Sequence, residues 1–338
     1  MKNVKFKGIS IIRYAFIFRF LKELEFKYSP LSSTVLTWGK KSHVNGNNVI
    51  CVEDGFIRSV GLGVHFNQPL SLVFDYSGIY FDSTKNSDLE NILNHTLFNK
   101  ALCDRASHVQ NELIRLGISK YNVGGDVNII LPSNKVIILV PGQVEGDASI
   151  EFGSPVIKKN QQLLTKVRQA NPDAYIIYKP HPDVVVGERD HGNWTLDLSE
   201  LADLIITDVS IDQMINIVDE VHTITSLAGF EALLRGKKVI TYGMPFYAGW
   251  GLTVDMENCV RRKRVLLLEE LIAGTLILYP KYLDPYSREL CTVERVIDII
   301  DEQRKVTRQP LTIYQHLLLL LKKVKQTYQV LLIRLFRK

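Results

Sequence analysis

Short runs of β-branched and apolar residues recur along the chain, and each ends at a glycine or a polar residue. Two such runs, 34–38 and 48–52, lie near the start, and their continuous apolar character is typical of buried parallel strands. An apolar stretch interrupted by arginines predicts a helix over 11–20, and leucines and isoleucines at helical spacing predict another after Asp88. This alternation indicates a Rossmann-like α/β layer for the first part of the chain.

The same alternation continues more clearly in the second half. We expect strands at 136–140, 174–178, 204–206, 222–224 and 238–241, with helices over 154–170 and 229–235 between them. Strands and helices repeating at this interval predict a doubly wound parallel sheet. Because 338 residues exceed the size at which one core usually keeps growing, we predict two domains, 1–133 and 134–305. The fold class expected is α/β, with two Rossmann-like doubly wound domains facing across a cleft.

The last segment, 306–338, intersperses apolar residues with lysines and arginines. This is the pattern of a basic amphipathic helix, which either packs back on the first domain or lies on a membrane surface. No stretch of the sequence approaches the roughly 18 uncharged apolar residues that span a bilayer. We therefore expect a protein that does not cross the membrane.

Composition and charge exclude several classes of protein. The chain is 46% hydrophobic and 23% charged, which is ordinary for a folded protein and unlike a disordered chain or a coiled coil. The net charge is +5, without zinc-finger spacing or a basic helix followed by heptads, so we expect an anionic ligand and no nucleic acid. Four widely separated cysteines argue against a zinc site or a disulfide framework. We expect a cytoplasmic location and no metal.

Polar loops that follow predicted strands are the candidate functional sites, because ligands of doubly wound sheets bind beyond the carboxyl ends of the strands. The first such loop holds Glu53, Asp54 and Arg58. A carboxylate in a cleft can act as the general base for an acceptor hydroxyl, and an arginine can bind an anionic sugar. A surface turn with a local ion pair would use the same residues.

The second loop, 141–149, directly follows the clearest predicted strand and reads PGQVEGDAS. Its glycines let the backbone approach a ligand closely. A carboxylate here, Glu145 or Asp147, can attack an anomeric carbon or act as a base. A loop that binds Ca²⁺ or Mg²⁺ is the alternative, although two clustered carboxylates are fewer than such a loop normally offers.

The third loop follows the strand predicted at 174–178 and holds Lys179 and His181. Prolines on both sides of His181 stiffen the backbone, so the imidazole has a defined direction. A histidine held in this way beside a lysine can bind a phosphate or protonate a leaving phosphate. A purely structural histidine is the alternative.

The fourth loop places Thr225, Ser226 and Gly229 where a strand gives way to a helix. Unpaired N–H groups and the dipole at a helix N-terminus attract phosphate, but serine and threonine are also ordinary N-caps. Glu231, in the first turn of this helix, is explained either by a favourable interaction with the helix dipole or by binding of ribose hydroxyls. Two further segments suit a sugar ring that bears a carboxylate. They are an aromatic, glycine-rich run over 243–251 and the four basic residues that begin at Arg261.

Taken together, these loops resemble one protein family. The strings that carry the resemblance are EDGFIRSVGLG (53–63), PGQVEGDAS (141–149), KPHPD (179–183), TSLAGFEALLRGKKV (225–239), YGMPFYAGWGLT (242–253) and LILYPKYLDP (276–285). They keep their order over most of the chain and are similar to the KpsC-type capsule transferases of β-Kdo, where Kdo is 3-deoxy-D-manno-octulosonic acid. The best-known members carry two such modules in tandem, whereas this sequence contains one.

The resemblance implies a GT-B fold and a retaining transfer of Kdo from CMP-β-Kdo, with no cofactor and no metal. It also implies that Asp147 is the nucleophile, which forms a covalent Kdo adduct. The residues that it assigns to binding CMP-Kdo are Gln143, Lys179, His181, Thr225, Ser226, Gly229, Glu231 and Arg58. The base that deprotonates the acceptor stays open among Glu53, Asp54 and Glu145.

The expected partners are CMP-Kdo and a Kdo-bearing glycolipid or polysaccharide acceptor of a capsule or lipopolysaccharide. The resemblance also implies peripheral association with the inner face of the bacterial inner membrane and with capsule assembly proteins. Two alternatives remain open at this point. One is a CMP-sialic acid-type transferase, and the other is a non-catalytic subunit of capsule assembly or export.

Overall fold

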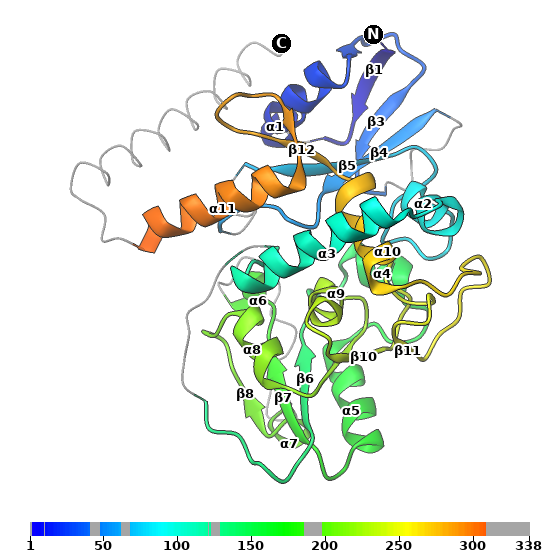
Figure 1. The fold of residues 1–338 in the computed structure, drawn as a ribbon. Helices are drawn as coiled ribbons and strands as arrows, with labels where there is room; N and C mark the ends of the chain where they lie inside the picture. Colours follow the sequence, from blue (N-terminus) through cyan, green and yellow to red (C-terminus); the bar gives the residue numbers. More distant parts are fainter. Residues whose placement is uncertain are drawn as a thin grey trace.

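The computed structural model describes residues 2–9, 11–40, 48–61, 68–120, 122, 129–185 and 198–308. Two β-sheets with helices around them make up this part of the chain, and Figure 1 shows the first sheet in blue above the second sheet in green. The helix predicted within 306–338 lies outside the described residues beyond Arg308.

The first sheet has seven strands in the order β13-β12-β5-β4-β3-β1-β2. They are β1 (Lys2–Lys7), β2 (Phe26–Tyr28), β3 (Val35–Trp38), β4 (Val49–Asp54), β5 (Ser71–Asp75), β12 (Lys281–Leu283) and β13 (Leu290–Cys291). The parallel pairing of β3 with β4 confirms the strands expected at 34–38 and 48–52. However, β5 runs antiparallel to both β4 and β12, so the first sheet is mixed and departs from the Rossmann-like, doubly wound sheet expected for this half. The described part of the β4–β5 connection contains no helix, and an antiparallel neighbour needs no helical crossover.

The second sheet has six strands in the order β11-β10-β9-β6-β7-β8, and all its pairs are parallel. They are β6 (Ile137–Pro141), β7 (Tyr175–Lys179), β8 (Leu204–Ile205), β9 (Glu220–Thr223), β10 (Lys238–Thr241) and β11 (Val254–Asp255). From the central β6 the chain moves outward on one side through β7 and β8, then returns and moves outward on the other side from β9. This is the doubly wound order with its switch point between β6 and β9, and it confirms the prediction for this half.

Helices connect the strands of both sheets. They are α1 (Ile11–Glu23), α2 (Asp88–His95), α3 (Lys100–Arg115), α4 (Ala148–Gly153), α5 (Asn160–Ala170), α6 (Pro182–Val185), α7 (Leu198–Leu201), α8 (Ile211–Ile217), α9 (Leu227–Leu234), α10 (Leu268–Ile272) with the π-helix η2 (Ala273–Leu278), and α11 (Val293–Arg308). The helix predicted over 154–170 begins only at Asn160, because Ser154 is extended, with φ −132° and ψ 123°. Pro155 follows it, and a residue before proline disfavours the helical conformation.

An apolar core joins the two sheets. Phe56, which follows β4, packs against Phe246 and Phe230, with ring centroids 4.6 and 6.4 Å apart. Figure 1 shows α3 crossing between the sheets, and its buried residues belong to the same core. After β11 the chain returns to the first sheet as β12 and β13, within the range 134–305 predicted for the second domain. The division into domains stays a prediction.

Candidate functional site

The described residues enclose a cavity of about 660 Å³ where the carboxyl ends of strands from both sheets approach each other. One wall comes from the loops after β6, β7 and β9, at the switch point of the second sheet. The opposite wall comes from the ends of β3 and β4 and from the residues after α3. Nine residues predicted from the sequence line it, namely Glu53, Asp54, Gln143, Asp147, Lys179, His181, Thr225, Ser226 and Glu231. Arg58, Glu145 and Gly229 do not line it.

Asp147 is held by the turn that precedes α4. Its Oδ1 accepts a hydrogen bond from the Ser149 N–H at 2.9 Å, which makes it the N-cap of that helix. Its own N–H donates to the Val144 carbonyl at 3.1 Å. Gly146 has φ +77°, a left-handed conformation that favours glycine. These contacts keep the carboxylate of Asp147 at the cavity.

Glu145, two residues earlier in the same loop, turns away from the cavity. Its Oε1 accepts the backbone N–H of Asn160 at 2.9 Å and so caps the start of α5. Asn160 also exchanges two hydrogen bonds with the backbone of Gln143, at 2.9 and 2.8 Å. The structure therefore separates the two carboxylates that the sequence left as alternatives: Asp147 faces the cavity, and Glu145 holds the loop on α5.

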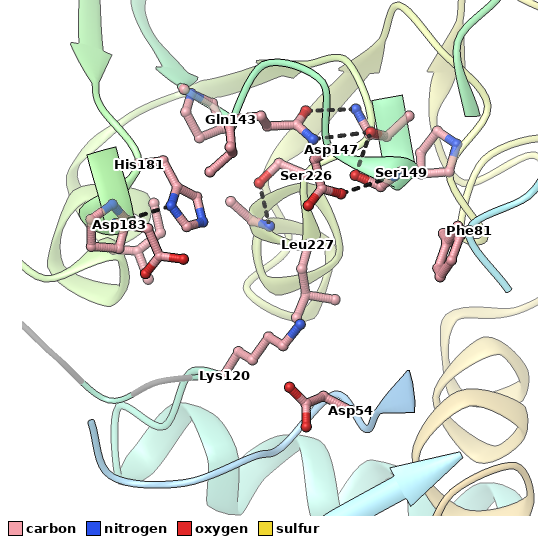
Figure 2. A pocket seen from close by; sticks show the side chains of 18 of the residues that line it. Asp54, Phe81, Lys120, Gln143, Asp147, Ser149, His181, Asp183, Ser226 and Leu227 are labelled. Carbon is pink, nitrogen blue, oxygen red and sulfur yellow. Dashed lines mark hydrogen bonds between the residues drawn. The ribbon is translucent and has the colours of Figure 1, made fainter. Parts of the chain in front are cut away.

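Gln143 bridges the switch point of the sheet. Its Oε1 accepts the Thr225 N–H at 2.9 Å, and its Nε2 donates to the Thr225 Oγ1 at 3.0 Å. The adjacent Ser226 caps α9 by accepting the Ala228 N–H at 3.2 Å. Ser226 is therefore an N-cap and also lines the cavity, so the N-terminus of α9 lies at the cavity wall, as Figure 2 shows.

Gly229 allows close packing beneath the N-terminus of α9. A Cβ atom at this position would lie 2.2 Å from the hydroxyl of Tyr247. That hydroxyl donates a hydrogen bond to the carbonyl of Ser226 at 2.5 Å. Only glycine leaves room for this contact, which explains why Gly229 stands beside the cavity residues in the sequence without lining the cavity.

His181 has a defined ring orientation. Its Nδ1 accepts the Asp183 N–H at 3.1 Å. Because an accepting ring nitrogen carries no proton, the neutral ring carries its proton on Nε2. Nearby, the Lys179 ammonium donates to the Thr207 carbonyl at 3.0 Å, and burial lowers its pKa.

The opposite wall carries the carboxyl groups of Glu53 and Asp54. Burial, and then the neighbouring charge of Asp54, raise the pKa of Glu53 to about 7. Arg58 is buried and donates from Nε to the Asp54 Oδ2 at 2.7 Å. Arg58 therefore contacts the cavity only through Asp54, and Glu53 is a carboxyl group that exchanges its proton near neutral pH.

Lys120 is a cavity residue that the sequence analysis missed. Its backbone N–H donates to the buried Glu231 Oε1 at 2.9 Å, and burial raises the pKa of Glu231. Figure 2 shows Lys120 and Asp54 on one side of the cavity, with Asp147 and His181 on the other. Lys120 follows a helix and not a strand, so a search for polar residues directly after predicted strands does not detect it.

Two further cations line the same wall, Arg13 from α1 and Lys40 just after β3. Lys40 follows a predicted strand by two residues, so the same rule could have found it. Arg13 lies inside a helix, where no comparable signal exists.

The basic run that begins at Arg261 does not line the cavity. Arg261 and Arg262 donate from their Nε atoms to the buried Glu90 of α2, at 2.7 and 3.2 Å. Arg264 donates to the Thr96 carbonyl at 2.8 Å. These arginines hold the chain after β11 against α2, so the structure does not support their predicted use for a sugar carboxylate.

Three negative findings concern only the described residues. No group of three or more histidine, cysteine, aspartate or glutamate side chains there is placed to hold a metal ion. No helix there is long and apolar enough to cross a membrane. All four cysteines lie in this part of the chain and are free thiols.

Curated proteins are similar to this chain over part of their own length. LipA of Neisseria meningitidis serogroup A, named a capsule polysaccharide modification protein, is 49% identical over 257 residues, which are 76% of this chain and 36% of LipA. The lipopolysaccharide-processing protein LpsZ of Rhizobium meliloti is 44% identical over 235 residues, 68% of this chain and 53% of LpsZ. The chain thus spans about a third to a half of the curated relatives that it matches.

Solved structures match over nearly the whole chain. The β-Kdo 2,7 transferase of Thermosulfurimonas dismutans KpsC is 39% identical, with a TM-score of 0.75, and the match covers 90% of this chain and 100% of that one. The β-Kdo 2,4 transferase of the same protein is 33% identical, with a TM-score of 0.79 and coverages of 88% and 98%. Residues 39–282 match the family model described as capsule polysaccharide biosynthesis protein. The chain therefore belongs to the capsule polysaccharide biosynthesis protein family and is similar to the KpsC β-Kdo transferases.

Proposed function

We propose that the chain is a retaining β-Kdo glycosyltransferase. It transfers Kdo from CMP-β-Kdo to a glycolipid or polysaccharide acceptor of a capsule or lipopolysaccharide, at the cytoplasmic face of the inner membrane. The observation that carries the proposal is that Asp147, His181 and Ser226 line one cavity at the switch point of a doubly wound sheet, in a chain similar to two KpsC transferases along nearly its whole length. The two sheets then correspond to the two halves of a GT-B fold.

The donor binds to the wall formed by the second sheet. Its phosphate lies at the N-terminus of α9, where Ser226 is the cap and the helix dipole favours an anion. His181 directs its Nε2–H toward the same phosphate, and Glu231 accepts from a ribose hydroxyl. The proposed reaction uses no metal and no cofactor, since these groups carry the charge of the leaving phosphate.

The first step forms a covalent adduct. A carboxylate oxygen of Asp147 attacks the anomeric carbon of Kdo, and the bond from that carbon to the phosphate oxygen breaks. CMP leaves with the electron pair of that bond, stabilised by hydrogen bonds from His181 and from the start of α9. The configuration at the anomeric carbon is inverted once.

The second step transfers Kdo to the acceptor. The acceptor hydroxyl attacks the same carbon from the other face, its proton passes to the carboxylate of Glu53, and the bond to Asp147 breaks. Two inversions give net retention. Glu53 suits the role of base because it lines the cavity and its pKa lies at about 7. Asp54 is engaged by Arg58, and Glu145 caps α5 outside the cavity.

Intact-protein mass spectrometry tests this proposal. The purified protein is incubated with CMP-Kdo generated in situ, and the wild type is compared with Asp147→Ala. We expect a mass increase of one Kdo residue in the wild type and none in the variant. Asp173→Ala is the matched control, because this exposed carboxylate precedes β7 and so lies at the opposite end of the sheet.

Other outcomes separate the alternatives. Release of CMP without an adduct would move the mechanism away from Asp147. CMP release from CMP-sialic acid but not from CMP-Kdo would favour a sialic acid-type transferase. A folded protein that releases CMP from neither donor would indicate a non-catalytic subunit of capsule assembly.

A further inference from the structure

The wall opposite the proposed donor site gathers three cations that the proposed chemistry does not use. Arg13, Lys40 and Lys120 all line this part of the cavity. They belong to α1, to the end of β3 and to the segment after α3, so the fold brings them together from separate parts of the chain. Clustered cations in a cleft attract and orient an anionic ligand.

Arg13 is placed by an aromatic ring. Its guanidinium carbon lies 4.3 Å from the ring centroid of Trp38, the last residue of β3, whose own side chain is buried. Stacking on the indole orients the plane of the guanidinium. A fork of this kind binds a carboxylate or a phosphate with two parallel hydrogen bonds.

Lys40 is placed by an acid and a second ring. Its Nζ donates to the Asp82 Oδ2 at 2.5 Å and lies 3.8 Å from the ring centroid of Phe152. An ammonium has three N–H donors, so the contact with Asp82 positions the group and leaves it able to donate to a ligand.

Both cations flank the proposed base. Trp38, whose ring stacks on Arg13, directly precedes Gly39 in the sequence, and Lys40 directly follows it. A Cβ atom at Gly39 would lie 3.2 Å from the Glu53 Oε2. The segment that holds Lys40 and the ring under Arg13 therefore packs against the carboxyl group that accepts the proton from the attacking hydroxyl.

We propose that Arg13 and Lys40 bind an oxyanion of the acceptor, a carboxylate or a phosphate, carried by the same unit as the attacked hydroxyl. This proposal rests on the proposed function and adds the chemistry by which the acceptor is recognised. An acceptor without this anion lacks the charge-assisted hydrogen bonds to Arg13 and Lys40, and it binds correspondingly less well.

The test compares matched acceptors. One pair is an alkyl β-glycoside of Kdo and its carboxamide, and the other is an alkyl glycoside with and without a phosphate group. For the wild type we expect kcat/KM for transfer to be about 10- to 100-fold higher with the anionic member of one pair, the effect of a charged hydrogen bond. The pair that shows the preference identifies the oxyanion as carboxylate or phosphate.

The variants are Arg13→Gln and Lys40→Gln, with Arg13→Lys to keep the charge without the fork. We expect both glutamine variants to lose most of the preference and Arg13→Lys to keep part of it, while the Kdo adduct on Asp147 still forms. Arg19→Gln is the control, because Arg19 lies on the same helix α1 but donates to Gln68 at 2.7 Å and does not line the cavity.

Equal rates with both members of each pair in the wild type would overturn the acceptor proposal, as would an unchanged preference in the variants. Adduct formation without acceptor is measured on every protein, and it confirms that each variant is folded and binds the donor. Absence of the adduct in the wild type would instead overturn the proposed function itself.

Discussion

At the scale of single residues, burial and the neighbouring charge of Asp54 change the acid–base chemistry of Glu53. Because its pKa is about 7, the group is largely protonated at slightly acidic pH and cannot then act as a base. We predict that transfer to the acceptor slows as the pH falls below about 7. Glu53→Gln should remove this pH dependence and slow transfer by roughly 10²- to 10⁴-fold, while the Kdo adduct still accumulates. The rate of transfer and the mass of the protein, both measured against pH, check this; unchanged transfer in the variant would assign the base elsewhere.

The same pKa predicts a pH dependence of stability. A folded-state pKa above the usual value of 4.5 means that the folded protein binds the proton more tightly than the unfolded chain. The free energy of unfolding that Glu53 contributes is therefore fully present below about pH 4.5 and is lost as the pH rises through about 7. We expect the wild type to lose about 1–3 kcal/mol more than Glu53→Gln across this range, measured by urea denaturation at several pH values. Parallel curves for the two proteins would contradict the raised pKa.

Gly229 gives a prediction about packing. We expect Gly229→Ala to lower the free energy of unfolding by about 1–3 kcal/mol, because its Cβ atom would press on the Tyr247 hydroxyl. In a Tyr247→Phe background the contact with the hydroxyl is absent, but the ring carbon Cζ at 2.7 Å remains, so the same substitution should cost less without becoming neutral. A double-mutant cycle measured by chemical denaturation checks this coupling; additive effects would show that the two groups do not meet.

At the scale of elements, the ion pairs of Glu90 hold α2 in place. Glu90 is buried and binds both Arg261 and Arg262. We predict that Glu90→Ala destabilises the fold by about 3–5 kcal/mol, because the buried charge of Arg262 then loses its carboxylate and keeps only backbone carbonyls as acceptors. Glu112→Ala, which removes an exposed pair with Arg115, should change stability far less, because water screens that pair. Thermal or chemical denaturation of both variants tests the contrast.

Strands and helices of the second sheet could largely be predicted, because continuous apolar runs and helical spacing depend only on neighbouring residues. All five strands expected there lie within two residues of the observed ones. The predictions were wrong where a contact at longer range or a single residue intervened. One predicted helix begins later than expected, after Pro155. The direction of β5 depends on its pairing with β4 and β12, which no local pattern encodes.

At the scale of the whole molecule, a ligand that fills the cavity contacts both sheets. A ligand that binds only the folded state raises the free energy of unfolding by about 2.7 kcal/mol at a concentration 100 times its Kd. We predict that CMP raises the unfolding temperature of the protein and that His181→Ala reduces this shift, because the variant lacks the donor at Nε2. UMP is the control nucleotide. An equal shift by CMP in both proteins would remove His181 from the proposed donor site.

Local pattern was enough to place Asp147, His181 and Ser226 at one edge of a sheet, because the carboxyl ends of parallel strands meet there. Only the folded chain decided which carboxylates face the cavity. It turned Glu145 onto α5, placed Glu53 opposite Asp147, and brought in cations from α1 and from the segment after α3. Hydrogen bonds within a loop and the packing of helices on distant strands set these directions, and neither depends on the spacing of residues along the sequence.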